Sequence, residues 1–136
     1  MNLRKIFIGL LVAAGFTMFF GSCGMDVKTI EPYLIKIDSI YAPDTVAVKS
    51  VFIVNVFGYV GPSKCYAFEK LYHYTNNQNE IIIEAWAKYA YYGDPCVEEV
   101  VRMSEELELG ISTPGTYTLK ALQPGNYYLE KKLVVK

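Results

Sequence analysis

The stretch TPGTYTLKALQPGNYYLEKKLVV, residues 113–135, decides the fold class of this chain. After the turn residues at its start, Tyr117, Leu119 and Ala121 alternate with polar side chains, which is the period of a strand with one buried face. Residues 123–126, Gln-Pro-Gly-Asn, have the composition of a tight turn. The apolar residues that follow supply a partner strand. The stretch therefore predicts a pair of strands at the end of an all-β domain.

The preceding chain contains further segments of strand length separated by turn residues. Expected strands cover residues 33–40, 46–59, 65–75, 80–92 and 97–109. The most apolar of these, 46–59, is expected to be central. Residues 97–109 fit either a helical stripe or a strand, and we expect a strand with an irregular start. Seven short strands predict two packed antiparallel sheets.

The last two expected strands carry a resemblance to a known fold. Residues 114–119, Pro-Gly-Thr-Tyr-Thr-Leu, followed by a strand ending Leu-Val-Val at 133–135, resemble the end of an immunoglobulin-like domain. The resemblance implies a tyrosine corner, in which the Tyr117 hydroxyl bonds to upstream backbone. Leu119 stands where such domains have their second core cysteine. We therefore expect an all-β fold, a two-sheet antiparallel immunoglobulin-like β-sandwich of about seven strands.

The amino terminus has the pattern of an export signal. Arg4 and Lys5 precede an apolar run over residues 6–20, which is short for a membrane span. Residues 20–23, Phe-Gly-Ser-Cys, resemble a bacterial lipobox with Phe20 in place of the usual leucine, a variation similar to lipoproteins of the Bacteroidota. The resemblance implies cleavage before Cys23, addition of diacylglycerol to its thiol and acylation of its amine.

The lipobox and the expected strands divide the chain into three parts. We expect residues 1–22 to form a lipoprotein signal peptide, 23–32 a lipidated tether and 33–136 the sandwich domain. The lipobox, the cysteine pair and the Pro-Gly-x-Tyr strand together resemble small uncharacterised Bacteroidota lipoproteins. Gly24, rather than aspartate, follows Cys23 and resembles lipoproteins sent to the outer membrane. The tether is poor in acidic residues, which favours a periplasm-facing orientation over surface exposure.

Cys65 and Cys96 are the other two cysteines of the chain. An exported compartment and an even pair predict a disulfide, and the departure from the immunoglobulin pattern places it at the periphery. A closed loop of roughly 30 residues contributes about 3 to 4 kcal/mol in the chain-entropy model. A metal site needs more donors than His73, the one histidine, supplies. We expect no cofactor and no metal.

Charge and motifs exclude several function classes. Without Arg4 and Lys5 the mature part has 11 basic and 14 acidic residues, so it presents no basic field for nucleic acid. Nucleotide-binding, hydrolase and zinc-protease motifs are missing from the sequence. The acidic residues at 98–99 and 105–108 allow a paired-acid glycosidase or a calcium site in principle, but fit a solvated face. We expect a protein that is not an enzyme.

Residues 65–75 and 80–92 flank Asn76-Asn77-Gln78-Asn79 and predict a hairpin. A turn centred near Asn77 places Lys70 opposite Glu84, a favourable cross-strand pair. The inward face would then hold Ala67, Leu71, Ile81, Ile83 and Ala87. The outward face would hold Tyr66, Phe68, Tyr72, Tyr74, Ile82, Trp86 and Tyr92.

An exposed row of aromatic rings would offer a surface for a partner. Such rings stack on sugars or pack against another protein. The alternative is that a neighbouring strand or loop covers them, and a slip of one residue would exchange the faces. The expected function is a membrane-anchored, non-catalytic binding or scaffolding module that contacts an envelope protein or polymer. The alternative is a carbohydrate-binding lipoprotein of a glycan uptake system, with Trp86 at its centre.

Overall fold

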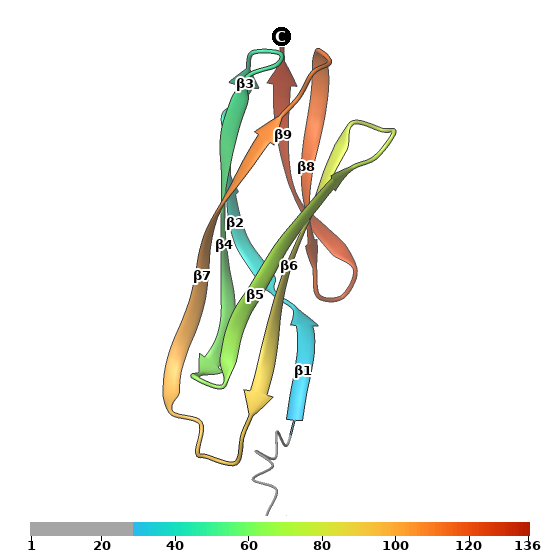
Figure 1. Cartoon of the computed structure of the whole chain (residues 1–136). Helices are drawn as coiled ribbons and strands as arrows, with labels where there is room; N and C mark the ends of the chain where they lie inside the picture. Colours follow the sequence, from blue (N-terminus) through green and yellow to red (C-terminus); the bar gives the residue numbers. More distant parts are fainter. Residues whose placement is uncertain (1–28) are drawn as a thin grey trace, which may run out of the picture.

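The computed structural model describes residues 29–136, in which every regular element is a β-strand (Figure 1). The strands are β1 (Thr29–Leu34), β2 (Lys36–Tyr41), β3 (Thr45–Val46), β4 (Val51–Ser63), β5 (Tyr66–Thr75), β6 (Glu80–Tyr91), β7 (Glu98–Gly110), β8 (Gly115–Gln123) and β9 (Tyr127–Val135).

The strands form two sheets that pack face to face. The larger sheet is built around β6. One side of β6 pairs with β5, and the other side pairs with β8 near the start of β6 and with β1 near its end. β9 and β3 continue this sheet beyond β8. The smaller sheet has the order β2-β4-β7, so β4 is its central strand, as its apolar sequence predicted. The prediction of an all-β, two-sheet sandwich is confirmed.

The expected first strand, 33–40, is divided between the two sheets. β1 pairs with β6, whereas β2 pairs with β4. At the crossing, the amide of the fully buried Ile35 donates to the carbonyl of Ala85 at 2.8 Å. This division and the short β3 raise the strand count above the expected seven. β1 begins at Thr29, so the end of the expected tether already belongs to the sheet.

Two pairings are parallel and depart from the expected antiparallel arrangement. β6 pairs with β8 over residues 80–83 and 118–121, and β3 pairs with β9. The β6–β8 pairing is parallel because of the path that the chain takes between these two strands. The chain leaves β6, runs back along β7 in the smaller sheet and returns in β8 in its original direction (Figure 1).

The segment that allowed either a helix or a strand is strand β7. It pairs with β4 from Val51↔Gly110 to Ser63↔Glu98, with register shifts on both sides of Gly61. This long pairing gives most β7 residues a partner on β4, whereas a helix would form its backbone hydrogen bonds within the segment. The tertiary pairing therefore decides between the two patterns.

The core lies between the sheets and is built from alternate residues of the strands. Its fully buried aliphatic side chains include Ile35, Val54, Val56, Ile83, Leu119 and Leu133. The buried amide of Gln123 is satisfied, because its Oε1 accepts from the Ile37 amide at 3.1 Å. That bond joins β8 of the larger sheet to β2 of the smaller one.

The predicted tyrosine-corner hydrogen bond is present. The hydroxyl of the buried Tyr117 donates to the carbonyl of Thr113 at 3.1 Å. It holds the turn that leads into β8.

Candidate functional site

The candidate site is the outer face of the β5–β6 hairpin, and the turn between these strands sets its register. Asn76 Oδ1 accepts from the amides of Gln78 at 2.9 Å and Glu80 at 3.1 Å, and Asn79 has a positive φ of 57°. The turn therefore closes one residue later than expected. Tyr72 lies opposite Glu84 and Lys70 opposite Trp86, so the expected Lys70–Glu84 pair is wrong.

A β-bulge then divides the hairpin into two parts. The register shifts between Phe68 and Lys70, which reverses the faces of all earlier β5 residues. Tyr66 and Phe68 consequently turn inward and pack against the core, whereas Ala67 is exposed. The expectation that Tyr66 and Phe68 belong to the outward row is therefore wrong. The other expected inward residues, Leu71, Ile81, Ile83 and Ala87, do contact or form the core.

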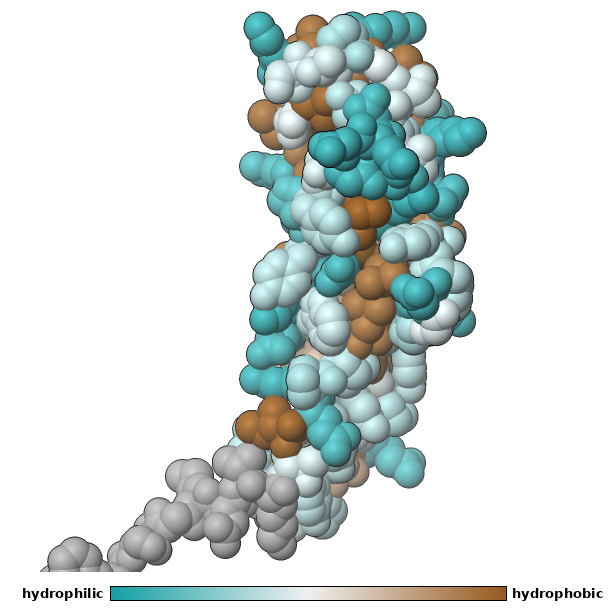
Figure 2. All heavy atoms as spheres, turned by 90° about the vertical axis from the view of Figure 1, so that its right-hand side faces the viewer, coloured by the Kyte–Doolittle hydropathy of each residue, from teal (hydrophilic) through white to brown (hydrophobic). Residues whose placement is uncertain are grey.

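The outward face beyond the bulge keeps Tyr72, Tyr74 and Trp86 together. Tyr72 and Tyr74 are 47% and 52% exposed, and Trp86 is half-buried. Ile82 lies between Tyr74 on β5 and Lys120 on β8. It is only 5% exposed although it is outside the core cluster, so side chains of the outer face cover it. Figure 2, which views the side of the larger sheet, shows an apolar strip bordered by residues of intermediate hydropathy and by hydrophilic residues.

Glu84 fixes two of the three rings. Its Oε2 accepts from Trp86 Nε1 at 3.1 Å, and its Oε1 accepts from the Tyr74 hydroxyl at 3.5 Å. The pKa of Tyr74 is raised, mainly by desolvation and to a smaller extent by the negative charge of Glu84. The ammonium of Lys70 lies 4.8 Å from the centre of the Tyr72 ring. The aromatic side chains are therefore held by charged neighbours on the same face.

An open cleft of about 370 Å³ lies beside these rings. It is lined by Pro32, Glu69, Lys70, Tyr72, Glu84 and Trp86. Pro32 reaches it because β1 pairs with β6, Pro32 lying opposite Lys88. The cleft thus combines a tryptophan edge with one cationic and two anionic side chains.

Next to the cleft, β8 carries a cation with two carboxylate partners. Lys120 Nζ lies 2.5 Å from Glu80 and 3.4 Å from Glu130. Hydrogen bonds from Lys120 and Asn76 lower the pKa of Glu80, and the Glu80 carboxylate raises the pKa of Lys120. The three groups together carry one net negative charge, and they lie on β8 and its neighbours beside Ile82.

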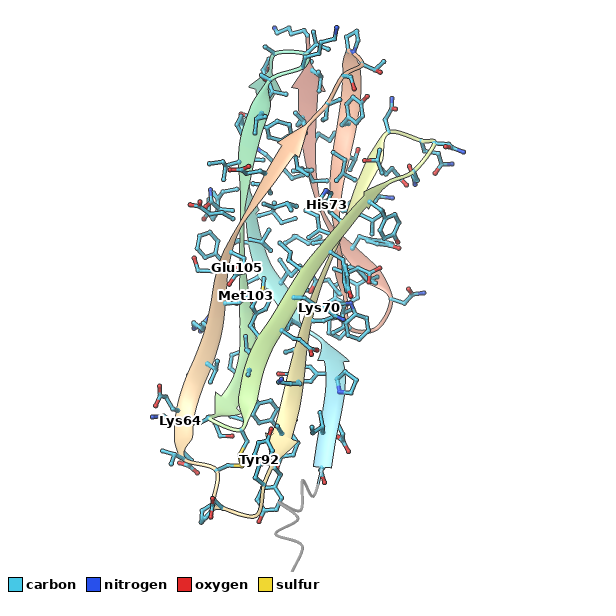
Figure 3. All side chains as sticks on the ribbon, viewed as in Figure 1. Lys64, Lys70, His73, Tyr92, Met103 and Glu105 are labelled. Carbon is cyan, nitrogen blue, oxygen red and sulfur yellow. A yellow bond between two sulfur atoms is a disulfide. The ribbon has the colours of Figure 1, made fainter. Side chains whose placement is uncertain are left out.

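Tyr92, the last residue of the expected row, lies apart from it. It follows the end of β6 and lines a second cleft, of about 330 Å³, beside the cysteine pair. Figure 3 shows Tyr92 and Lys64 at one end of the molecule and Lys70 further along the hairpin. The site therefore consists of Tyr72, Tyr74 and Trp86 without Tyr92.

Cys65 and Cys96 form the predicted disulfide. Their Cα atoms are 5.5 Å apart, and the bond joins the β4–β5 turn to the β6–β7 loop. It lies at the end of the sandwich, which matches the expected peripheral position.

Sequence reasoning missed a group of tyrosines on the inner side of this end. Tyr66 packs edge-on against Tyr33 at 5.9 Å and lies 5.0 Å from Tyr89 between ring centres. The Tyr33 hydroxyl donates to the Val60 carbonyl, and burial raises the pKa of Tyr33 to about 12. Tyr66 also lies directly over Gly61, where β4 bulges. No local sequence signal marks this group, because the β5 bulge is what turns Tyr66 inward.

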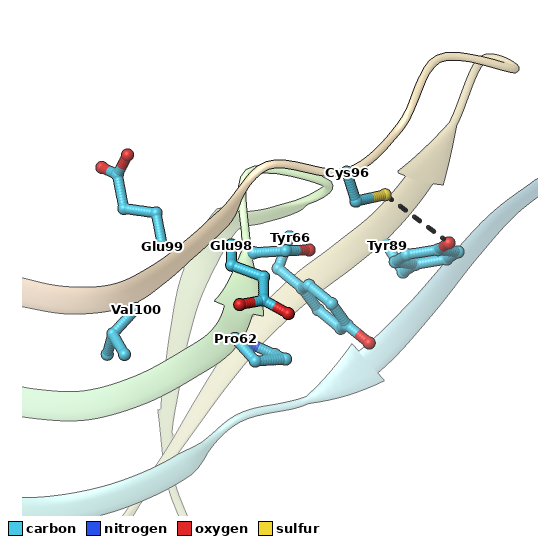
Figure 4. Close-up of a pocket in the computed structure, with 8 residues that line it drawn as sticks. Pro62, Tyr66, Tyr89, Cys96, Glu98, Glu99 and Val100 are labelled. Atoms are coloured by element: carbon cyan, nitrogen blue, oxygen red, sulfur yellow. Dashed lines mark hydrogen bonds between the residues drawn. The ribbon is translucent and has the colours of Figure 1, made fainter.

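A third cleft, of about 560 Å³, opens beside these tyrosines. Figure 4 shows Glu98 near Pro62 and Tyr66, with Tyr89 next to Cys96. The Tyr89 hydroxyl and Cys96 Sγ are 3.9 Å apart, which is a weak contact. Ser63 also lines this cleft with Glu98 and Glu99, but among the described residues no hydrogen bond joins its hydroxyl to either carboxylate.

The other residues considered for chemistry are dispersed. His73 is exposed on β5 opposite Ile83, and Glu99 pairs with Lys64 at 3.0 Å. Within residues 29–136 no group of three or more histidine, cysteine or acidic side chains could hold a metal ion. The same range contains no helix long and apolar enough to cross a membrane. Cys23 and the signal segment lie outside the described residues.

No family model, curated protein or solved structure matches this chain.

Proposed function

We propose that this chain is a lipoprotein of the cell envelope, anchored through Cys23, that acts as a non-catalytic binding module. The signal and lipobox pattern supports the anchor and favours an outer-membrane position facing the periplasm. The binding role is supported above all by one observation. Trp86 is half-buried, tied to Glu84 and placed at an open cleft with Tyr72, so a rigid aromatic surface faces solvent. Ordered aromatic side chains of this kind dominate protein recognition surfaces.

The anchor is tested by labelling growing cells with radioactive palmitate. The wild-type chain should take up label, and Cys23→Ser should not. Mass spectrometry of the mature amino terminus should give a lipidated Cys23. A secreted product with a free thiol at this position would refute the anchor.

The binding surface is tested by site-specific photocrosslinking in intact envelopes. A photoreactive residue in place of Tyr72 should give a discrete crosslinked partner. The matched control is Tyr41, which is 64% exposed on β2 of the smaller sheet. Equal crosslinking from both positions would contradict a specific face.

A glycan is the second candidate partner, and the composition of the cleft favours it. A tryptophan edge flanked by Glu69, Lys70 and Glu84 offers stacking together with donors and acceptors for hydroxyl groups. A panel of polysaccharides should then quench the fluorescence of Trp86. Trp86→Ala should abolish retention on the active polysaccharide, and Tyr41→Ala should leave it unchanged. Quenching by none of the panel would leave the protein partner as the proposed function.

A further inference from the structure

The end of the domain at which the chain enters is the end closed by the disulfide. Thr29, the first residue of β1, pairs with Tyr91, the last residue of β6. The β6–β7 loop and the β4–β5 turn lie at this same end, and the C-terminus lies at the opposite end (Figure 1). The tether to Cys23 therefore leaves the domain beside this loop.

Apolar side chains are exposed around that point. Ile30 is 53% exposed, Tyr92 58% and Val97 59%. Tyr92, Pro95 and Val97 together line the cleft of about 330 Å³. We call the four side chains Ile30, Tyr92, Pro95 and Val97 the tethered tip. Apolar side chains from two segments of the chain, β1 and the β6–β7 loop, thus meet where the tether begins.

Charged groups at the rim of the tip fit a lipid headgroup layer. Lys64 and Lys88 line the same cleft as Tyr92, and Asp94 lies on it as well. Lys64 is already paired with Glu99. Lysine stems beside apolar side chains, together with a tyrosine, are typical of residues at a membrane interface. Because both signs of charge are present, contact does not require an anionic lipid.

The tether limits how far the tip can lie from the membrane. Five residues separate Cys23 from Thr29, and six extended steps span at most about 20 Å. The 13-residue strand β4 alone has a length of about 43 Å at roughly 3.3 Å per residue. The anchored domain therefore cannot stand with its opposite end on the membrane, because the tether could not reach Thr29 at that height. Only orientations with the tip near the membrane, or with the domain lying flat, are open to it.

We propose that the tethered tip inserts into the headgroup region of the membrane that holds the lipid of Cys23. This inference rests on the proposed lipid anchor. The domain then stands on its disulfide end, and the face with Tyr72, Tyr74 and Trp86 is directed sideways and stays open to a partner.

The test uses the full lipidated chain in vesicles of phosphatidylcholine brominated on its acyl chains. Two variants each carry a single tryptophan in a Trp86→Phe background: Tyr92→Trp at the tip and Val51→Trp at the far end. Val51 is the first residue of β4 and is 70% exposed, so it is a matched exposed position. Bromine should quench Tyr92→Trp several-fold more strongly than Val51→Trp.

Three results would overturn the inference. Equal quenching at the two positions would show that the domain does not stand on its tip. If bromine does not quench the Tyr92→Trp fluorescence but its emission maximum shifts with the density of protein on the vesicles, the tip contacts other copies of the chain instead. If the chain does not float with the vesicles, the anchor itself fails, whereas a floating chain without quenching contradicts the tip alone.

Discussion

Replacing Gly61 with alanine should destabilise the domain, because Tyr66 occupies the space of the added methyl group. A Cβ built on Gly61 lies 2.6 Å from Tyr66 Cδ1 and closer still to its Cγ. Ordinary carbon contacts are about 3.5 to 4.0 Å, so the ring would have to move by more than about 1 Å. Tyr33 and Tyr89 confine that ring on its other sides.

Overpacking of a filled core typically costs about 1 to 3 kcal/mol, and we expect Gly61→Ala to cost about 3 kcal/mol of unfolding free energy. Urea denaturation followed by far-ultraviolet circular dichroism measures the loss. Gly110→Ala is the matched control, since its added Cβ meets nothing nearer than the Ser50 carbonyl at 3.9 Å. It should change the stability by less than about 0.5 kcal/mol.

A double-mutant cycle isolates the cause. The Tyr66 Cβ also lies only 2.5 Å from the added methyl group, so the second variant must remove it together with the ring. Once Tyr66→Gly has done so, adding Gly61→Ala should cost less than about 1 kcal/mol, because the obstructing atoms are gone. If Gly61→Ala costs the same in both backgrounds, the loss comes from the backbone of β4 and the steric reasoning is refuted.

Three further predictions concern stability. Replacing both Cys65 and Cys96, 31 residues apart, by alanine should cost about 4 kcal/mol from loop entropy, measured by urea denaturation against the oxidised wild type; an unchanged midpoint would contradict it. Tyr117→Phe should cost about 1 kcal/mol through loss of the corner hydrogen bond, and equal thermal midpoints would argue against its role. The folded pKa of Glu80 lies below its ordinary value of 4.5, so its contribution is complete above that pH and is lost as the pH falls through the folded pKa. Glu80→Gln should therefore weaken the loss of stability on acidification, and parallel pH profiles for variant and wild type would exclude the Lys120 pairing as the cause.

The parts of the fold that follow from local patterns could be predicted from the sequence. Alternation over residues 116–121 gave β8, and the Pro-Gly-x-Tyr resemblance gave the Tyr117 hydrogen bond. The parallel β6–β8 pairing could not be predicted, because it depends on the path of β7 through the other sheet.

The candidate site was predicted only in part, for two local reasons. The β5 bulge has no glycine or proline to mark it, since Glu69 occupies the extra position. The turn register depends on Asn76 accepting two amides, and four neighbouring polar turn residues leave several such choices open. The prediction placed three rings correctly on one face: Tyr72, Tyr74 and Trp86. They lie on the turn side of the bulge, so the bulge does not affect them. An error of one residue in the turn centre moves the cross-strand pairing by two positions, which leaves each side chain on the same face.

The division of the first strand between two sheets determines how the domain bears mechanical load. A force between a membrane anchor and a partner bound on the hairpin would enter at Thr29 and run along the axis of β1. All six β1 residues pair with β6, so their hydrogen bonds would be loaded together in shear instead of being opened one after another. Behind them, Ile35 passes the chain into β2 and hence into the second sheet, so extraction of the strand would have to disrupt both layers. The junction between tether and sandwich is thus built to resist pulling at the point where an anchored protein would be pulled.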